Sequence, residues 1–167
     1  NGDAISPGVV PGNSGVILST GDAEDFTNSS GQANQSTRTT TNTSGENNNS
    51  QFNAAAGART YDASYLDVDF IPNASVLTMQ FVFSSEEYPE FENSIYQDFI
   101  GVWVNGSEVP IEVGNGDVDP GNINSSSNIN LFLNNDDDDF NTEMDGITIT
   151  LTLTMLVNPN ELNSIRI

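Results

Sequence analysis

The side chains of this sequence that could do chemistry are carboxylates, and they occur in clusters. The chain has 167 residues, with 24 Asp and Glu against three Lys and Arg, and it contains no His and no Cys. A formal net charge of −21 makes a compact domain repel itself, so folding requires bound cations, high salt or a large stabilising core. Clustered carboxylate oxygens are hard ligands of the kind that Ca²⁺ prefers. The composition therefore predicts an extracellular domain that binds calcium.

The missing residue types exclude many kinds of catalysis. Without His, Cys or Lys, the chain cannot build a Ser-His-Asp triad, a thiol nucleophile, an ordinary zinc site or a Schiff base. A carboxylate pair of the glycosidase type or a metal-bound water remains available, but we do not expect an enzyme. Nucleic acid is an unsuitable partner because each phosphate would be repelled. No run of about 18 apolar residues occurs, so membrane insertion is not expected.

The segment that combines acids with aromatic residues is the strongest candidate for a ligand site. It runs from Ser84 through Glu86, Glu87 and Tyr88 to Phe91, directly after an apolar stretch. Acids at the end of a buried strand form a plausible ligand-binding rim. In the alternative reading, this is a charged loop whose aromatic rings plug the end of the domain. Asp98 follows shortly afterwards and leads into the next apolar stretch.

Two spaced pairs of acids have two readings each. Asp67 and Asp69 lie two apart, so a strand would place both on one face, about 6.6 Å apart, where they bind a cation or face solvent. Asp117 and Asp119 resemble the start of a calcium loop or of an Asx-rich turn. Their surroundings are not those of an EF-hand, because Pro120 stands where that loop needs Gly.

The run of four acids from Asp136 to Asp139 is the most conspicuous cluster but not the best site. Adjacent residues of an extended chain point to alternate sides, so four consecutive carboxylates cannot all converge on one ion. We interpret this run as a solvated charged segment from which one or two residues bind a cation.

Alternating apolar residues predict the strands that must position these acids. Asn105-Gly106 between two apolar stretches predicts a tight hairpin. Residues 27–58 are rich in Asn, Ser, Thr and Gly and predict a long surface loop, with at most a helical turn near Ala55. The sequence therefore predicts a single domain over residues 1–167, an all-β, two-sheet antiparallel β-sandwich with long Ca-binding loops. The predicted strands are residues 15–20, 65–70, 76–83, 99–104, 109–113, 129–133, 147–154 and 164–167.

Four stretches of the chain resemble the choice-of-anchor L domain of bacterial secreted and surface proteins. Their order and spacing agree over most of the chain from Gly15 on. The stretches are Gly15-Val16-Ile17-Leu18-Ser19-Thr20-Gly21-Asp22-Ala23, Phe81-Val82-Phe83-Ser84-Ser85-Glu86-Glu87-Tyr88, Gln97-Asp98-Phe99-Ile100-Gly101 and Met144-Asp145-Gly146-Ile147. The chain also resembles the peptide-binding domain of large repeats-in-toxin (RTX) adhesins. That pattern implies a further Asp-bearing segment after Ile167, which would close the sandwich.

The resemblance implies a calcium-bound β-sandwich on the bacterial cell surface that captures a short peptide or protein segment. The terminal carboxylate of the peptide would help to ligate a site calcium. We expect Glu86, Glu87, Asp98 and Asp145 to surround this ion, with Asp117 and Asp119 at a second site. The expected ligand contacts are Glu86, Glu87, Tyr88, Phe91 and Asp98, while Trp103 on a strand is expected in the core.

Three other functions remain compatible with the sequence. Calcium with aromatic residues also binds sugars, which would make the domain a lectin-like adhesin module. Calcium could instead only stiffen a spacer domain of a surface filament. The acids could also be halophilic surface charge without a specific ion site.

Overall fold

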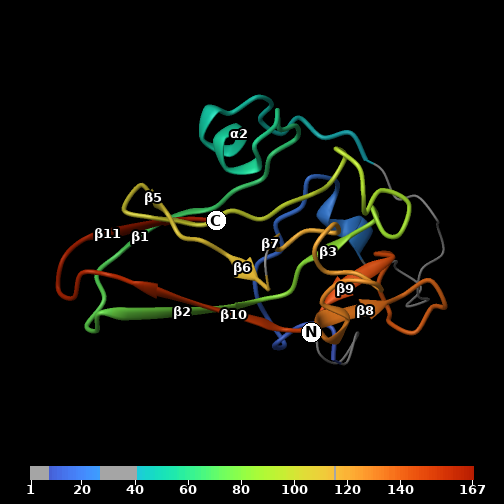
Figure 1. Cartoon of the computed structure of the whole chain (residues 1–167). Helices are drawn as coiled ribbons and strands as arrows, with labels where there is room; N and C mark the ends of the chain where they lie inside the picture. The colour runs from blue at the N-terminus through green and yellow to red at the C-terminus, as the bar shows by residue number, and fades with distance from the viewer. Residues whose placement is uncertain (1–7, 27–40, 115) are drawn as a thin grey trace.

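A computed structural model describes residues 8–26, 41–114 and 116–167, and its architecture is all-β and antiparallel, as predicted (Figure 1). Within the described residues the strands form four antiparallel sheets, of orders β1-β11-β4-β5, β10-β2, β3-β9-β8 and β6-β7. The described elements are η1 (Ala23–Phe26), α2 (Ser50–Ala56), β1 (Asp67–Phe70), β2 (Val76–Phe81), β3 (Ser84–Ser85), β4 (Trp103–Val104), β5 (Ser107–Glu108), β6 (Glu112–Val113), β7 (Gly116–Asp117), η2 (Ile129–Leu131), β8 (Phe132–Asn134), β9 (Gly146–Thr148), β10 (Leu151–Leu156) and β11 (Asn163–Arg166).

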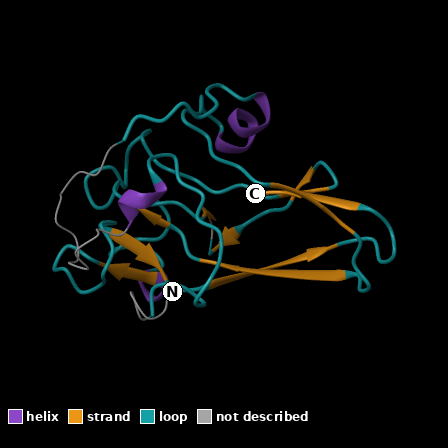
Figure 2. Ribbon diagram, turned by 180° about the vertical axis from the view of Figure 1, so that it is seen from behind, coloured by secondary structure: helices purple, strands orange, loops and turns teal. Residues whose placement is uncertain are grey.

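The sheet β1-β11-β4-β5 and the β2-β10 ribbon lie in two layers, which is the sandwich part of the fold (Figure 1, and from behind in Figure 2). Alternate side chains of each strand turn inward, so β2 and β10 contribute every second residue to the space between the layers. The larger apolar core fills this space. Its buried members are Val102, Val104, Met155, Val157 and Ile165.

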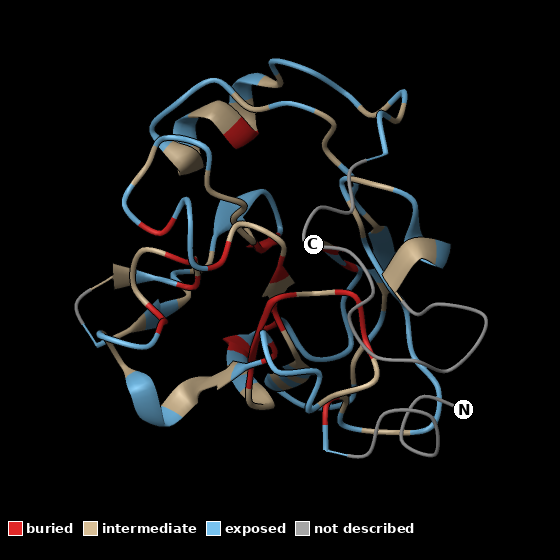
Figure 3. Cartoon of the chain, turned by 90° about the vertical axis from the view of Figure 1, so that its right-hand side faces the viewer, coloured by how far each residue is buried: buried red, intermediate tan, exposed pale blue. Residues whose placement is uncertain are grey.

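The sheet β3-β9-β8 forms the other part of the domain, together with the loops that surround it. A second apolar cluster of Phe83, Val118 and Ile123 lies here, packed against side chains from β2, β6, β8 and β10. Figure 3 shows buried segments gathered at the centre and exposed turns around them. The two clusters share Ile111 as a packing partner, so the two parts of the core adjoin.

The Asn105-Gly106 hairpin is confirmed. It joins β4 to β5, and both turn residues have positive φ angles, 52° and 78°. Two residues with positive φ are what a type I′ turn requires, and Asn and Gly tolerate that conformation best.

Other predicted strands differ from the observed ones. The alternating run 147–154 is two strands, because β9 pairs with β3 and β8 whereas β10 pairs with β2. Alternation reports which face is buried but not which sheet a strand joins. The predicted strand at residues 15–20 is wrong, since this segment forms no ladder and leaves Val16 70% exposed. Residues 129–131 form the 3₁₀ turn η2, and only then does β8 begin.

Helix α2 is longer than the single turn expected inside the loop at residues 27–58, of which residues 27–40 lie outside the described residues. Asn49 caps the helix, since its Oδ1 accepts the N–H groups of Gln51 and Phe52 at 2.9 and 3.2 Å. Gly57, with φ of 62°, ends it in the left-handed conformation. The described helices include none that is long and apolar enough to cross a membrane.

Arg166 on β11 fastens helix α2 to the sheet. Its Nε and Nη2 donate hydrogen bonds to the two carboxylate oxygens of Asp67, each at 2.7 Å, and these bonds lower the pKa of Asp67. Its Nη1 donates to Gln51 of the helix at 2.8 Å. The guanidinium also lies 4.8 Å from the centre of the Tyr65 ring. One side chain therefore joins two strands, a helix and an aromatic ring.

Replacing Arg166 by Met should loosen this attachment while keeping the apolar packing of the stem. We expect the melting temperature to fall by about 2–4 °C, which corresponds to about 1 kcal/mol for a domain of this size. The matched control is Arg59→Met, which removes an equal charge from an arginine that lies 5.2 Å over the Tyr61 ring. Equal shifts for the two variants would show that the Asp67 and Gln51 contacts do not stabilise the fold.

Candidate functional site

Strand pairing brings the main predicted acids to one edge of the sheet β3-β9-β8. Ser85 of β3 pairs with Gly146 of β9, so Glu86 and Glu87, which follow Ser85, come to the same edge as Asp145, which precedes Gly146. Asp98 joins them through Ser85, whose hydroxyl donates a hydrogen bond to Asp98 Oδ2 at 2.8 Å. We call Glu86, Glu87, Asp98 and Asp145 the acidic end.

Ser85 also fixes the direction of the chain at the acidic end. Its Oγ accepts the backbone N–H of Glu87 at 3.0 Å, which forms a local turn directly after β3. The residue itself is buried, with 1% exposure. A single buried hydroxyl therefore connects the loop after β3 with the segment that carries Asp98.

Burial and neighbouring charges disfavour the charged form of Glu87 at the acidic end. Burial raises the pKa of Glu87 from its usual 4.5 to about 7, and the charges of Asp98 and Glu90 contribute. The Glu87 Oε2 atom is buried without a hydrogen-bond partner. Burial also raises the pKa of Asp98, against the opposing effect of the Ser85 hydrogen bond. The site therefore favours a proton or a cation next to Glu87 at neutral pH.

In chelator, Glu87 should make the protein more stable as the pH falls from 7.5 to 5.5. The folded state takes up a proton at Glu87 below about pH 7, whereas the unfolded chain does so only near pH 4.5. The resulting stabilisation of the folded state is therefore complete below pH 4.5 and is lost as the pH rises through about 7. Because other acids titrate too, the measurement is the difference in the free energy of unfolding between Glu87→Gln and the parent, determined by urea unfolding at each pH. We expect the variant to be more stable at pH 7.5, with the difference shrinking toward pH 5.5. A difference independent of pH would contradict the raised pKa.

Tyr88 is a core residue at this edge, with no exposed surface. Its hydroxyl donates to the Ile123 carbonyl at 2.8 Å, and its ring lies 4.9 Å from that of Phe132. The ring also covers Gly146 so closely that a Cβ there would overlap it. Tyr88 therefore plugs the end of the domain, as in the alternative interpretation of this segment. It holds the loop in place and has no surface for a ligand in this structure.

An exposed apolar surface lies on the same loop, a few residues after Tyr88. Phe91 is 36% exposed, Tyr96 67% and Ile95 87%. The rings of Phe91 and Tyr96 meet edge to face with centroids 6.1 Å apart. Hydrogen bonds from Phe91 N to Glu87 O and from Ser94 N to Phe91 O, each 2.9 Å, order the loop. We call Phe91, Ile95 and Tyr96 the apolar rim, of which only Phe91 is among the ligand contacts predicted from the sequence.

The second predicted pair, Asp117 and Asp119, lies on β7 and in the turn that follows. Asp119 Oδ1 accepts the Asn122 N–H at 2.7 Å, which is an Asx-type turn, and Asn122 in turn donates to the carbonyls of Val113 and Asp117 at 2.8 Å. Burial raises the pKa of Asp119. Burial raises the pKa of Tyr88, and the charge of Asp119 adds to this. The Tyr88 hydroxyl also donates to the Ile123 carbonyl, so the segment that follows this turn lies against the acidic end. A calcium ion at this turn stays a prediction.

The third pair is separate from the others. Asp67 and Asp69 lie on β1 in the sandwich part, both exposed, and the Asp67 carboxylate is bound by Arg166. Among the described residues, no group of three or more Asp and Glu is close enough to hold a metal ion by itself. A cation at any predicted position therefore also requires backbone oxygens, water or ligand oxygens.

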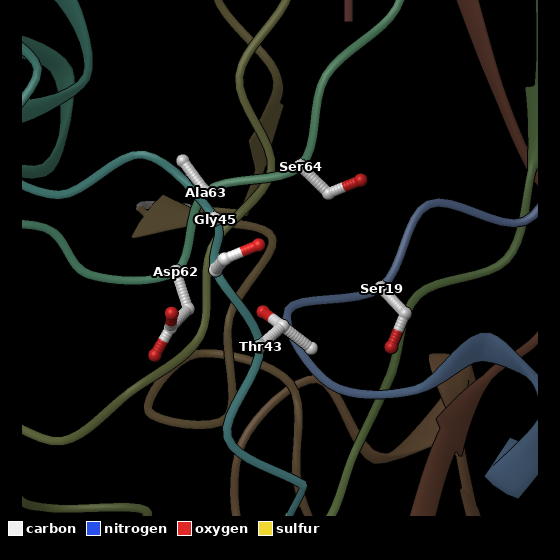
Figure 4. Close-up of a pocket in the computed structure, with 7 residues that line it drawn as sticks. Ser19, Thr43, Gly45, Asp62, Ala63 and Ser64 are labelled. Atoms are coloured by element: carbon white, nitrogen blue, oxygen red, sulfur yellow. The ribbon is translucent and has the colours of Figure 1, made fainter.

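Two hollows lie outside the acidic end. One, of about 280 Å³, is open and is surrounded by short polar side chains (Figure 4). It is lined by Ser19, Thr43, Ser44, Gly45, Asp62, Ala63 and Ser64. The other, of about 130 Å³, lies between β2, β10 and the 110–113 segment and is mainly apolar. No residue of the acidic end lines either hollow.

The sequence profile of the choice-of-anchor L domain matches residues 6–167, which is almost the whole chain. The chain belongs to the choice-of-anchor L family. Membership places this choice-of-anchor L domain among surface-associated domains of bacteria. No curated protein and no solved structure matches the sequence.

Proposed function

We propose that this choice-of-anchor L domain is a Ca²⁺-dependent peptide- or protein-binding module of a bacterial adhesin, similar in role to the peptide-binding domains of RTX adhesins. Family membership supports a role at the cell surface. The acidic end and the adjoining apolar rim support a binding site for a short peptide segment.

The observation that carries the proposal is the buried Glu87 Oε2 atom, which has no hydrogen-bond partner and faces the like charges of Asp98 and Glu90. A buried carboxylate oxygen without a donor is costly unless a proton or a cation compensates it. The chain offers few cationic side chains for this purpose, since it has only three Arg and no Lys. A bound metal ion is therefore the suitable partner at neutral pH.

The donor atoms of the acidic end fit calcium. They are hard carboxylate oxygens. In this arrangement at most two of Glu86, Glu87, Asp98 and Asp145 would hold one ion, and backbone carbonyls, water and ligand oxygens would complete its shell. When bound, calcium supplies a local positive charge and open coordination positions for an anionic ligand group. This explains how so acidic a domain could capture a peptide through a carboxylate end.

The apolar rim would supply the remaining contact surface. Phe91, Ile95 and Tyr96 are held outward by the hydrogen bonds of an ordered loop, so little conformational entropy is lost when they meet a ligand. Aromatic side chains are enriched among the residues that contribute most to binding. The expected ligand therefore joins a carboxylate to an apolar side chain.

Removal of calcium should lower the melting temperature of the domain. At a free concentration about 100 times its dissociation constant, each independent calcium contributes about 2.7 kcal/mol to stability. The measurement is calorimetry in millimolar calcium and in chelator, with magnesium as the control ion. An unchanged melting temperature in chelator would contradict a calcium-dependent function.

The deciding experiment is binding to a combined array of peptides and glycans, with calcium and with chelator. Calcium-dependent peptide hits that share a carboxylate end would support the proposal. Glycan hits would instead favour a lectin-like module. An array without peptide or glycan hits, together with a melting temperature that still depends on calcium, would favour a spacer domain stiffened by calcium.

A further inference from the structure

An apolar hollow that the proposed function does not use lies beside strand β10. It has a volume of about 130 Å³ and borders Phe81 of β2, the 110–113 segment and residues 151–153 of β10. Buried Val118 and half-buried Ile111 form part of its wall, and both belong to the packing of the apolar core. An apolar cavity of about 150 Å³ takes up a benzene molecule, so this hollow has room for one apolar side chain.

The hollow reaches the edge of β10 and is not confined to one face of the strand. Leu151 and Leu153 point to one face and Thr152 to the other, yet all three border the hollow. Strand β2 pairs with β10 on one side, and no described strand pairs with its other side. The residues of β10 include none of the charges or prolines that protect sheet edges from further pairing. An extended segment that paired with this edge would place a side chain at the hollow.

Two acids that face each other stand beside the hollow. Glu112 of β6 borders it and lies directly opposite Asp117 of β7 in the ladder, and both residues are exposed. Like charges at directly opposite positions destabilise a ladder, because their Cβ atoms are only about 4.5–5.5 Å apart. Neither carboxylate has an ion pair or a hydrogen bond with another described residue. The two described arginines, Arg59 and Arg166, contact other side chains.

We propose that the hollow binds an extended segment of a partner protein that carries an apolar residue close to a Lys or Arg. The segment pairs with the outer edge of β10, its apolar side chain enters the hollow, and its cationic side chain meets Glu112 and Asp117. The basic residue follows from charge complementarity, since the acid pair is uncompensated and the chain carries a net charge of −21. The inference goes beyond the proposed function, because it uses another surface and a cationic ligand group.

The test measures the binding of fluorescent heptapeptides that are blocked at both ends and therefore have no terminal carboxylate. Each contains one Leu and one Lys among Thr and Ser residues, and the set covers every spacing of the two. Anisotropy is recorded in calcium and in chelator, at a temperature at which circular dichroism shows the domain folded in both. At least one spacing should bind in both conditions and slow the amide hydrogen exchange of β10. Replacing Lys by Glu in that peptide should abolish its binding.

Two pairs of variants locate the bound peptide. Thr152→Trp puts a large side chain at the hollow from an exposed position and should weaken binding by at least about tenfold. Thr78→Trp, on the same face of the β2-β10 ribbon but away from the hollow, should leave binding unchanged. Glu112→Gln should weaken binding about threefold at low salt and less at high salt, because the charge pair is exposed. Glu108→Gln removes an exposed acid of β5 and should have no effect.

The outcomes distinguish this site from the acidic end and from self-association. Absence of binding by every Leu-Lys peptide overturns the inference, and so does binding that requires calcium or that persists in Thr152→Trp. Equal affinity for the Leu-Glu peptides overturns it as well. Dimers of the parent that dissociate in Thr152→Trp, without peptide binding, would assign the edge to a second copy of the chain and overturn the peptide site. None of these results contradicts the proposed function, which is tested with carboxylate-ended peptides in calcium.

Discussion

Replacing Gly146 by Ala should destabilise the domain more than any other single methyl group added to a described glycine. A Cβ at this position would overlap the Tyr88 ring and approach the Phe132 ring, and Tyr88 is fully buried and cannot turn away. Overpacking of a filled core costs about 1–3 kcal/mol, and here strand β9 must also move. The measurement is the free energy of unfolding in urea, with calcium present. Because Ser85 pairs with this glycine, we also expect weaker calcium binding at the acidic end.

Gly15→Ala is the matched control for this change. A Cβ at Gly15 would meet nothing within 4 Å, and its φ angle lies outside the left-handed region. We expect its unfolding free energy to equal that of the parent. If Gly146→Ala behaved like Gly15→Ala, the close packing of Tyr88 on β9 would not be a stabilising feature.

The double variant Glu86→Gln and Glu87→Gln should lose ligand capture while it keeps the fold. Removal of two charged ligands should weaken calcium binding at the acidic end by at least about tenfold, and peptide capture should fall with it. In chelator the variant should be at least as stable as the parent, because it lacks the buried charge of Glu87. Binding is measured with peptides selected on the array, and stability by urea unfolding.

The control for this variant is Glu108→Gln with Glu161→Gln, which removes two exposed acids from other parts of the domain. This pair should leave capture unchanged apart from the effect of overall charge, which high salt suppresses. Parallel losses of capture and of stability in the test variant would make Glu86 and Glu87 structural residues.

The parts of the fold that follow local rules could be predicted from the sequence. The hairpin at Asn105-Gly106 depends on backbone preferences of two adjacent residues, and the strands at 76–81 and 163–166 depend on neighbouring apolar residues. The division of residues 147–154 between two sheets depends on distant partners, and no local pattern reports it.

The same distinction applies to the candidate site. The acids that follow a strongly apolar strand could be recognised as the end of a buried element, which is why Glu86 and Glu87 could be named. The pairing of Asp67 with Arg166 joins residues 99 positions apart, so spacing alone could not show it.

The order in which the strands pair has a consequence for how the chain reaches its folded state. Strand β1 pairs with β11, β2 with β10 and β3 with β9, so the pairs are nested and join the early and late parts of the sequence. Such distant contacts make folding slow, because a long loop must close before any of these ladders stabilises it. The three nested sheets cannot close until residues 146–166 have been synthesised. We therefore expect an emerging chain to stay without these three ladders until late in synthesis, and to fold only after its last strands are available.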